Sequence, residues 1–359
     1  MSKDQKLLLF IGSYAEAENS GVYVYEMNEE TGSLTRRDEV SGLKNPTFLN
    51  VDTAERRLYS IGESALESGG KAAEAVAFSI DGTSGKLTEL NREVNLDATT
   101  CHINRDSSNQ VLIVSSYHGG KVGLVQLEKD GRVGKLLDEK QHEGRGAHPE
   151  RQDRPHVHSA FFSPDERFLF VNDLGLDIVR AYTVDLEQGK LHFHADIKTE
   201  PGAGPRHLAF HPSGNYVYVM NEVNSTIASF RYEAATGHME AVQVVSTLPD
   251  DFEGENTTAE IAVSQDGRFV YGSNRGHDSL VVYAVDDKTG ELTLVERISS
   301  EGAHPRHFAL SPNGNHLIAA NRDTNNLVTF KVDKESGRLK FTGVSEEVSK
   351  PVCVKPVYM

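Results

Sequence analysis

The chain has 359 residues, of which 38% are hydrophobic and 25% are charged, and its formal net charge is −16. This composition is sufficient for a substantial soluble core and excludes a chain that is disordered throughout. The acidic charge argues against a general nucleic-acid-binding protein. It also repels anions at long range, so an anionic ligand would need a local cluster of Arg and His.

The N-terminal region contains a short apolar run from Leu7 to Gly12. This run is too short for the hydrophobic core of a signal peptide, and no later run approaches the length of a transmembrane helix. The two cysteines, Cys101 and Cys353, are too few for a disulfide framework, which fits a reducing compartment. We therefore expect a cytoplasmic protein with no membrane and no nucleic-acid partner.

The body of the chain repeats a β-hairpin, in which a short strand, a tight polar turn and a second strand follow one another. The repeats start at steps of about 50 residues, close to the length of a propeller blade. After each hairpin, a strand rich in β-branched and aromatic residues runs into a Gly-containing turn, which indicates four strands per unit. The hairpins begin at Pro46, Thr99, His158, Arg206, Ala259 and Arg306.

Six full units extend from about residue 45 to about residue 343, at the blade length noted above. The N-terminus supplies a half unit from Leu7 to Leu34, and the C-terminus ends in a lone stretch, PVCVKPVYM. Together these can form a seventh blade that closes the ring and leaves no sheet edge bare. We predict an all-β, single-domain, seven-bladed β-propeller over residues 1–359, with four-stranded antiparallel blades. A pair of β-sandwiches or an open array is the alternative.

Residues at the open end of each hairpin can be paired by number, because opposed residues sum to twice the turn centre. This sum sets Arg206 opposite Glu222 and Arg306 opposite Arg322. The first pair also fits an ordinary cross-strand ion pair. The second pair opposes two like charges, which requires either an anion between them or a carboxylate for each from a neighbouring blade.

The same sums set Ala259 opposite Arg275 and His158 opposite Leu174, and Glu63 takes the place of Glu222 in the first unit. Because the first strand of each blade is innermost, all these open ends should gather at one mouth of the channel. The second unit supplies no such pair, so we expect the site on one side of the funnel. The predicted ring consists of Glu63, His158, Arg206, Glu222, Arg275, Arg306 and Arg322.

Other histidines are less informative. His207 and His307 follow the two arginines and should point to the opposite side of their strands, so we expect them to pack between blades and bond a backbone group. No zinc spacing, phosphate loop or nucleophile elbow is present, and we predict no metal and no cofactor. The histidines that could reach the funnel are His102, His118, His148 and His156.

The (P)RH(L/F)A(F/L)(H/S)P repeats, the VMNE segment that ends at Glu222 and the chain length resemble the lactonase family of seven-bladed propellers. Its members include bacterial 6-phosphogluconolactonases and fungal 3-carboxy-cis,cis-muconate lactonizing enzymes. In that family a His, two Arg and a Glu at the channel mouth are the proposed active-site residues. The resemblance carries these roles to His158, Arg206 and Glu222 by spacing, and to Arg275 by its place after the SN pair.

The resemblance implies hydrolysis of a phosphorylated sugar lactone, 6-phosphogluconolactone first among them. We expect His158 to be the base, since a neutral His has a pKa near neutrality, and Glu222 to orient Arg206. One arginine would stabilise the oxyanion and another would bind phosphate, with Arg306, Arg322 and Glu63 as substrate-binding candidates. The alternatives are a carboxymuconate-type cycloisomerase and a non-enzymatic binding propeller, which predicts a large exposed apolar patch. The oligomeric state is left open.

Overall fold

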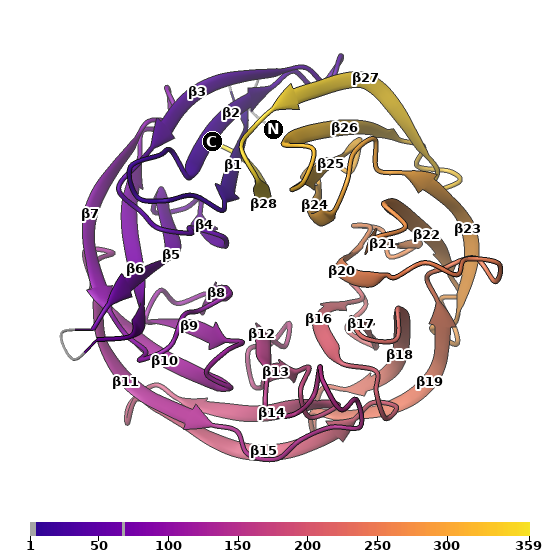
Figure 1. The fold of residues 1–359 in the computed structure, drawn as a ribbon, viewed down its shortest axis with the longest axis horizontal. Coiled ribbons are helices and arrows are strands. Elements are labelled where there is room, and N and C mark those ends of the chain that lie inside the picture. The colour runs from indigo at the N-terminus through magenta and orange to yellow at the C-terminus, as the bar shows by residue number, and fades with distance from the viewer. Residues whose placement is uncertain (1–4, 67–68) are drawn as a thin grey trace.

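The computed structural model describes residues 5–66 and 69–359, and all regular secondary structure within these ranges is β-strand. The strands form seven four-stranded antiparallel sheets arranged around a central opening (Figure 1). The predicted seven-bladed propeller is thus confirmed. Within the described ranges no helix is long and apolar enough to cross a membrane.

The first three blades are each one continuous stretch of chain, with the innermost strand first. The first blade contains β4 (Leu49–Asp52), β5 (Arg57–Ala65), β6 (Lys71–Ile80) and β7 (Leu87–Val94). The second contains β8 (His102–Arg105), β9 (Val111–Ser116), β10 (Lys121–Leu127) and β11 (Val133–Gln141). The third contains β12 (Val157–Phe162), β13 (Leu169–Asp173), β14 (Ile178–Asp185) and β15 (Lys190–Lys198).

The next three blades follow the same order. The fourth contains β16 (Pro205–Phe210), β17 (Tyr216–Asn221), β18 (Thr226–Glu233) and β19 (His238–Ser246). The fifth contains β20 (Thr257–Val263), β21 (Phe269–Arg275), β22 (Ser279–Val285) and β23 (Leu292–Ser299). The sixth contains β24 (Pro305–Leu310), β25 (His316–Asn321), β26 (Asn326–Val332) and β27 (Leu339–Glu347).

The seventh blade joins the two ends of the chain, as expected. The C-terminal strand β28 (Pro351–Tyr358) is innermost and pairs with β1 (Leu7–Ser13), which is followed by β2 (Val22–Met27) and β3 (Leu34–Val40). The N-terminus therefore supplies three strands where the sequence indicated a half unit. This pairing closes the ring and covers the inner edge of β1.

The position of a strand within its blade determines how its residues are buried. Every residue of β17 is buried, because middle strands are covered on both faces by the adjacent blades. In the outer strand β19 Met239 is the one buried residue and the others are half-buried or exposed, because one edge of an outer strand faces solvent. The turn between β16 and β17 needs Gly214, whose φ of 73° lies in the left-handed region.

A β-bulge recurs on the innermost strands and overturns the predicted pairings. In the fourth blade Pro205 lies opposite Asn221 and His207 opposite Met220, so Arg206 is the extra residue. Glu222 instead donates its N–H to the carbonyl of Gly204 at 2.7 Å. A sum of residue numbers assumes an uninterrupted ladder, so it places Arg206 opposite Glu222 wrongly.

The same irregularity corrects two further pairings. The third blade shifts register between Val157 and Ser159, so His158 is the extra residue and does not face Leu174. In the fifth blade Thr257, not Ala259, lies opposite Arg275.

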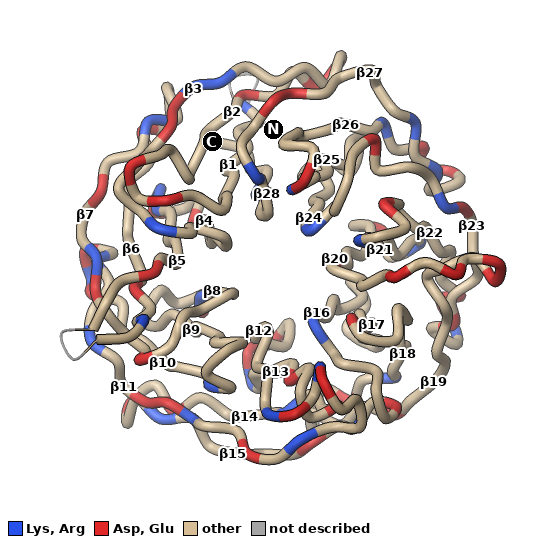
Figure 2. The backbone as a smooth tube through the Cα atoms, in the orientation of Figure 1, with Lys and Arg blue, Asp and Glu red and all other residues tan. Residues whose placement is uncertain are grey.

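The sixth blade has its bulge at Arg306, between Pro305 and His307. Arg322 therefore does not face Arg306, and its N–H bonds the carbonyl of His304 at 3.1 Å. A bulge re-aims the side chains beside it, here toward the channel. Basic positions on the innermost strands β16, β24 and β28 border the central opening (Figure 2).

Candidate active site

A cavity of about 230 Å³ lies where the open ends of the hairpins meet. It brings together four predicted residues, His158, Glu222, Arg306 and Glu63. The second blade, from which no site residue was expected, lines it as well, so the site is not confined to the third to sixth blades. Its lining consists of Tyr14, Asn45, Thr47, Glu63, Thr99, Thr100, Cys101, Tyr117, His118, His158, Glu222 and Arg306.

Glu222 is a buried carboxylate surrounded by three guanidinium groups. Its Oε2 lies 3.1 Å from Arg206 Nε and 2.8 Å from Arg275 Nη2, and its Oε1 accepts a hydrogen bond from Arg151. Burial opposes ionisation of Glu222, but the charges of Arg275, Arg206 and Arg151 outweigh it and hold its pKa far below the usual value. Glu222 is therefore ionised at any physiological pH.

Arg206 and Arg275 are fixed by backbone carbonyls as well as by Glu222. Arg206 Nη1 donates to the carbonyl of Ala259 at 2.6 Å, and Arg275 donates to the carbonyl of Thr258. Burial, followed by the charges of Arg275 and Arg306, lowers the pKa of Arg206 to about 9, so it stays charged at neutral pH. Both arginines are positioned to hold Glu222, and neither lines the cavity.

Arg151 is a residue that the sequence reasoning missed. It lies in the long connection between β11 and β12, outside the repeated hairpin, so no register could assign it a place. Gln152 anchors this loop, because its Nε2 donates to the carbonyl of Leu174 at 2.8 Å. The Arg151 side chain is 35% exposed, so it holds Glu222 from the rim.

His158 is buried next to the cavity, and its ring lies edge-on to Tyr117 with a centroid distance of 5.8 Å. Burial, then the charges of Arg206, His207 and Arg306, lower its pKa well below the usual value. The imidazole is thus neutral at physiological pH. Cys101 donates its thiol to the carbonyl of His158 at 3.1 Å, and burial raises the pKa of this thiol to about 11, so it is no nucleophile.

Arg306 lines the cavity and has no carboxylate partner in the part of the chain that the structure describes. Its guanidinium lies 5.8 Å from the centroid of the Tyr14 ring, a cation–π contact. Arg322 lies outside the cavity and bonds its own neighbour, with 2.6 Å between its Nε and Asp323 Oδ1. Arg322 is therefore not brought to the cavity, and its substrate-binding role stays a prediction, whereas Arg306 remains available to an anion.

Glu63 occupies the position of Glu222 in the first blade, as predicted. Its N–H donates to the carbonyl of Lys44 at 2.9 Å, the same backbone contact that Glu222 makes. Its carboxylate accepts a hydrogen bond from Asn45 Nδ2 at 2.9 Å and lies 3.4 Å from Lys71 Nζ. Glu63 thus lines the cavity as a carboxylate that pairs with no arginine among the described residues.

Two of the four histidines left open by the sequence belong to this region. His118 lines the cavity, and His156 stacks on Tyr117 with a centroid distance of 4.2 Å. His148 accepts backbone N–H groups of its own loop, and His102 is buried against Phe48 deeper in the channel.

His307 bonds a backbone group as expected, since its Nδ1 accepts the N–H of Val354 at 3.3 Å, but both His207 and His307 also lie against Glu260. His207 Nδ1 lies 3.0 Å from Glu260 Oε1, and His307 Nε2 lies 3.1 Å from Glu260 Oε2. The His207 ring also contacts Phe48 and His102, which belong to blades on the far side of the ring. Both histidines therefore face the channel, because the bulge lets consecutive side chains point inward.

The surroundings of the cavity are cationic in an acidic protein. The lining residues and their ion-pair partners carry five positive charges, on Lys71, Arg151, Arg206, Arg275 and Arg306, and two negative ones, on Glu63 and Glu222, which leaves +3. This is the local cluster that the net charge of −16 made necessary for an anionic ligand. Within the described ranges no group of His, Cys, Asp and Glu side chains is arranged to hold a metal.

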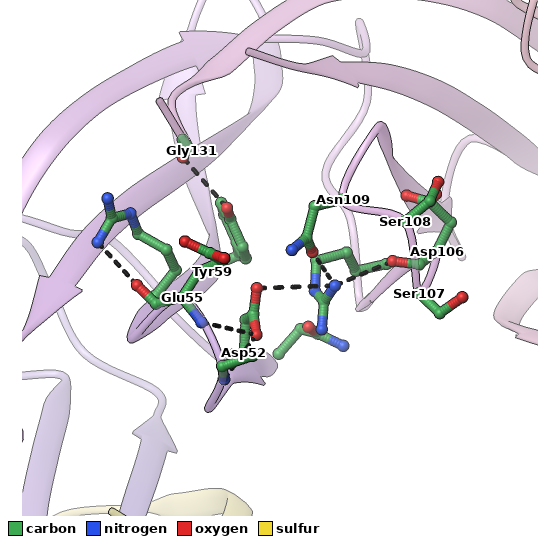
Figure 3. A network of polar contacts seen from close by, with 12 residues as sticks. Asp52, Glu55, Tyr59, Asp106, Ser107, Ser108, Asn109 and Gly131 are labelled. Carbon is green, nitrogen blue, oxygen red and sulfur yellow. Dashed lines mark hydrogen bonds and ion pairs between the residues drawn. The ribbon is translucent and has the colours of Figure 1, made fainter. Parts of the chain in front are cut away.

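A larger cavity, of about 1060 Å³, lies at the turn end of the first two hairpins, away from the predicted residues. Asp52 and Arg105 approach to 3.8 Å there, and Tyr59 donates its hydroxyl to the carbonyl of Gly131 at 3.1 Å (Figure 3). Its polar groups serve turns and inter-blade contacts. The candidate site is therefore the smaller cavity, which holds four of the predicted residues.

The closed seven-bladed ring and the cavity at one channel mouth define a propeller with a candidate small-molecule site. The chain belongs to the lactonase family of seven-bladed β-propellers, whose model matches residues 8–356. It is 40% identical to a 6-phosphogluconolactonase of Bacillus subtilis over 350 residues, 98% of each chain.

Two solved structures are closely similar. A Pseudomonas aeruginosa periplasmic gluconolactonase has a TM-score of 0.91 and 31% identity, with 98% of this chain and 99% of that chain covered. A Bacteroides fragilis protein named as a candidate 6-phosphogluconolactonase has a TM-score of 0.91 and 30% identity, with 99% of each chain covered.

Proposed function

We propose that the protein hydrolyses a sugar lactone, 6-phosphogluconolactone to 6-phosphogluconate, in the cavity at the channel mouth. The observation that carries this proposal is that Arg306, which has no carboxylate partner among the described residues, lines the same cavity as the neutral imidazole of His158. The Bacillus subtilis relative of this name supports the choice of substrate. The proposed chemistry needs no metal and no cofactor.

The base in this proposal is His158. Its Nε2 takes a proton from water while the water oxygen attacks the lactone carbonyl carbon. Arg306 lines the same cavity as His158, and in this proposal it donates to the carbonyl oxygen that becomes an oxyanion. Glu222, held by its arginines, accepts a hydrogen bond from the water or a substrate hydroxyl.

The phosphate in this proposal is bound at the rim. Arg151 is partly exposed there and retains N–H groups beyond its contact with Glu222. A guanidinium binds phosphate bidentately, and the phosphate lies at the end of the sugar remote from the carbonyl. In this proposal Arg151 thus binds the phosphate, and Arg306 stabilises the oxyanion.

The experiment is a coupled assay with freshly prepared 6-phosphogluconolactone, compared with the spontaneous hydrolysis of the same solution. We expect acceleration that scales with enzyme concentration. No acceleration above the spontaneous rate contradicts the proposal.

Thermal shifts distinguish the remaining readings. Stabilisation by 6-phosphogluconate, and less by gluconate, is expected for the proposed substrate. Stabilisation by dicarboxylates alone would favour a cycloisomerase of carboxymuconate type. The binding-propeller reading lacks its apolar patch, since the large exposed hydrophobic residues of the described ranges are scattered: Val94, Leu186, Phe193, Val244 and Leu294.

We also propose a cytoplasmic location, in the pentose phosphate pathway. Both cysteines are free, which is consistent with a reducing compartment. Because the Pseudomonas aeruginosa neighbour is periplasmic, cell fractionation is the appropriate test. Recovery outside the cytoplasmic fraction would contradict this location.

A further inference from the structure

A second polar cluster lies one residue deeper in the channel than the candidate site, and the roles proposed above do not use it. Glu260 of β20 lies between His207 of β16 and His307 of β24, with distances of 3.0 Å and 3.1 Å to their ring nitrogens. All three side chains are buried. Burial of a carboxylate between two neutral histidines costs free energy, because the carboxylate loses its hydration.

The contacts determine which nitrogen of each histidine carries a proton. Val354 donates its N–H to His307 Nδ1 at 3.3 Å, so the proton of the neutral His307 ring is on Nε2, which lies 3.1 Å from Glu260 Oε2. Glu260 Oε1 accepts the N–H of Ile261 at 3.1 Å, so it acts as an acceptor, and His207 donates to it through Nδ1 at 3.0 Å. The Nε2 of His207 is then an unprotonated acceptor, and it is buried without a partner among the described residues.

His158 supplies the matching group. Its Nδ1 is also buried and has no partner in the part of the chain that the structure describes, and its ring centroid lies 5.2 Å from that of His207 in an edge-to-face arrangement. Because His158 lines the cavity and its Nδ1 is inaccessible, the other ring nitrogen, Nε2, is the one that meets the substrate. Two adjacent histidines thus each retain one buried, unused nitrogen.

We propose that Glu260 and His207 are positioning residues that form a proton relay behind His158. His158 donates Nδ1–H to His207 Nε2, through a small ring rotation or one bridging water, which leaves the lone pair of Nε2 facing the substrate water. This inference rests on the proposed function, because it assigns the relay to the base of that reaction. The second nitrogen of a functional histidine commonly determines its tautomer.

The relay accounts for each proton that moves during the reaction. Water loses a proton to His158 Nε2 as its oxygen bonds the carbonyl carbon, and His158 passes its Nδ1 proton to His207 Nε2. The resulting imidazolium lies against the carboxylate of Glu260. When the bond between the carbonyl carbon and the ring oxygen breaks, the protons move back and His158 Nε2–H protonates the leaving oxygen.

Several groups facing His207 make such an anion necessary. Burial, then the charges of Arg206, Lys355 and Arg306, lower the pKa of His207, and His102, His158, Phe48 and Phe161 surround the ring. Glu260 is the carboxylate among its direct contacts within the described ranges. The charge of Glu222 also raises the pKa of His207, but Glu260 is the anion in direct contact with the ring among the described residues.

The first test needs no substrate. In ¹⁵N-histidine spectra of the whole protein at neutral pH, we expect His158 and His207 as Nδ1–H tautomers and His307 as the Nε2–H tautomer. His207→Phe should convert His158 to Nε2–H. A wild-type His158 already protonated at Nε2 overturns the relay.

The second test is the pH profile of Glu260→Gln, which keeps the shape but removes the charge. We expect kcat to fall about 100-fold, with KM little changed. The acid limb of kcat/KM should move to lower pH, because the lost carboxylate had favoured the protonated pair. Glu74→Gln, another buried carboxylate, paired with Arg92 at 3.2 Å, is the matched control and should behave as wild type.

A fall in rate without displacement of the acid limb would mean a merely structural role for Glu260 and would overturn the relay. If wild-type enzyme hydrolyses the lactone and Glu260→Gln is unchanged, the relay fails and the proposed function stands. If wild-type enzyme does not hydrolyse the lactone, the proposed function fails, and the histidine tautomers alone decide whether the proton contact exists.

Discussion

Arg306 differs from the other arginines at the channel mouth in its lack of a carboxylate partner within the described ranges. Because a neutralised guanidinium contributes little to an incoming anion, Arg306 should dominate oxyanion stabilisation. We expect Arg306→Ala to lower kcat by about 10²–10³, the typical effect of removing one such donor. Steady-state kinetics measure this.

Arg322 is the matched control, since it lies beyond the cavity and bonds Asp323. Arg322→Ala should leave kcat within about twofold, as expected for an exposed ion pair that contributes little. Equal losses in the two variants would contradict the assignment.

Arg151 offers a second test at the scale of single residues. If it binds the phosphate at the rim, Arg151→Ala should raise KM for the phosphorylated lactone about tenfold or more and change KM for the unphosphorylated lactone little. A kinetic comparison of the two substrates measures this. Loss of kcat on both substrates would instead assign Arg151 to the reaction centre.

The ionised carboxylate of Glu222 contributes to the stability of the fold. Glu222→Gln leaves three guanidinium groups without their carboxylate, which should destabilise the fold by about 3–5 kcal/mol. The native pKa of Glu222 is depressed, so its contribution is full above its unfolded-state pKa and is lost as pH falls toward its native value. Urea denaturation between pH 3 and pH 7 should show a shallower acid dependence in the variant, and an unchanged dependence would contradict this.

At the scale of elements, hairpin register determined how far the sequence could predict the site. The repeat placed Arg206 near Glu222 correctly, since a one-residue error still leaves long side chains within reach. It failed for His207 and His307, because the bulge sends consecutive side chains into the channel and no residue pattern marks it. Arg151 could not be found, since its loop follows no repeat. The sequence predicted no site residue in the second blade, because Thr99 and Tyr117, which line the cavity, carry no charge.

The closing strand β28 is the element whose loss should matter most. Val354 is fully buried in the seventh blade, whereas Val357 on the same strand is partly exposed. We expect Val354→Asp to lower stability by several kcal/mol through the cost of burying a charge, and Val357→Asp to cost much less. Thermal unfolding of the two variants measures the difference, and equal melting temperatures would contradict the role of β28.

At the scale of the whole molecule, the channel accumulates buried neutral histidines. Burial, the first cause for each, lowers the pKa of His102, His158 and His207, and lowers the pKa of His307 to about 3. A depressed histidine pKa means that the unfolded chain binds more protons, so stability is full above about pH 6.5 and falls below it.

Each such histidine should contribute about 1.4 kcal/mol per pH unit to this slope. We expect unfolding free energies, measured in urea at pH 5, 6 and 7, to fall steeply toward acid. His307→Gln should reduce the slope by about one proton, whereas the same change at the exposed His192 should not alter it. A pH-independent free energy would contradict the neutral state of these side chains.

The pairing of β28 with β1 also has a consequence for how the chain is made. The strand that begins at Leu7 is synthesised 344 residues before its partner begins at Pro351. At about 5–20 residues per second, the inner edge of β1 stays unpaired on the ribosome for roughly 20–70 s. During that interval the nascent protein carries an open β-edge beside apolar residues, which is a template for pairing with other chains until β28 covers it.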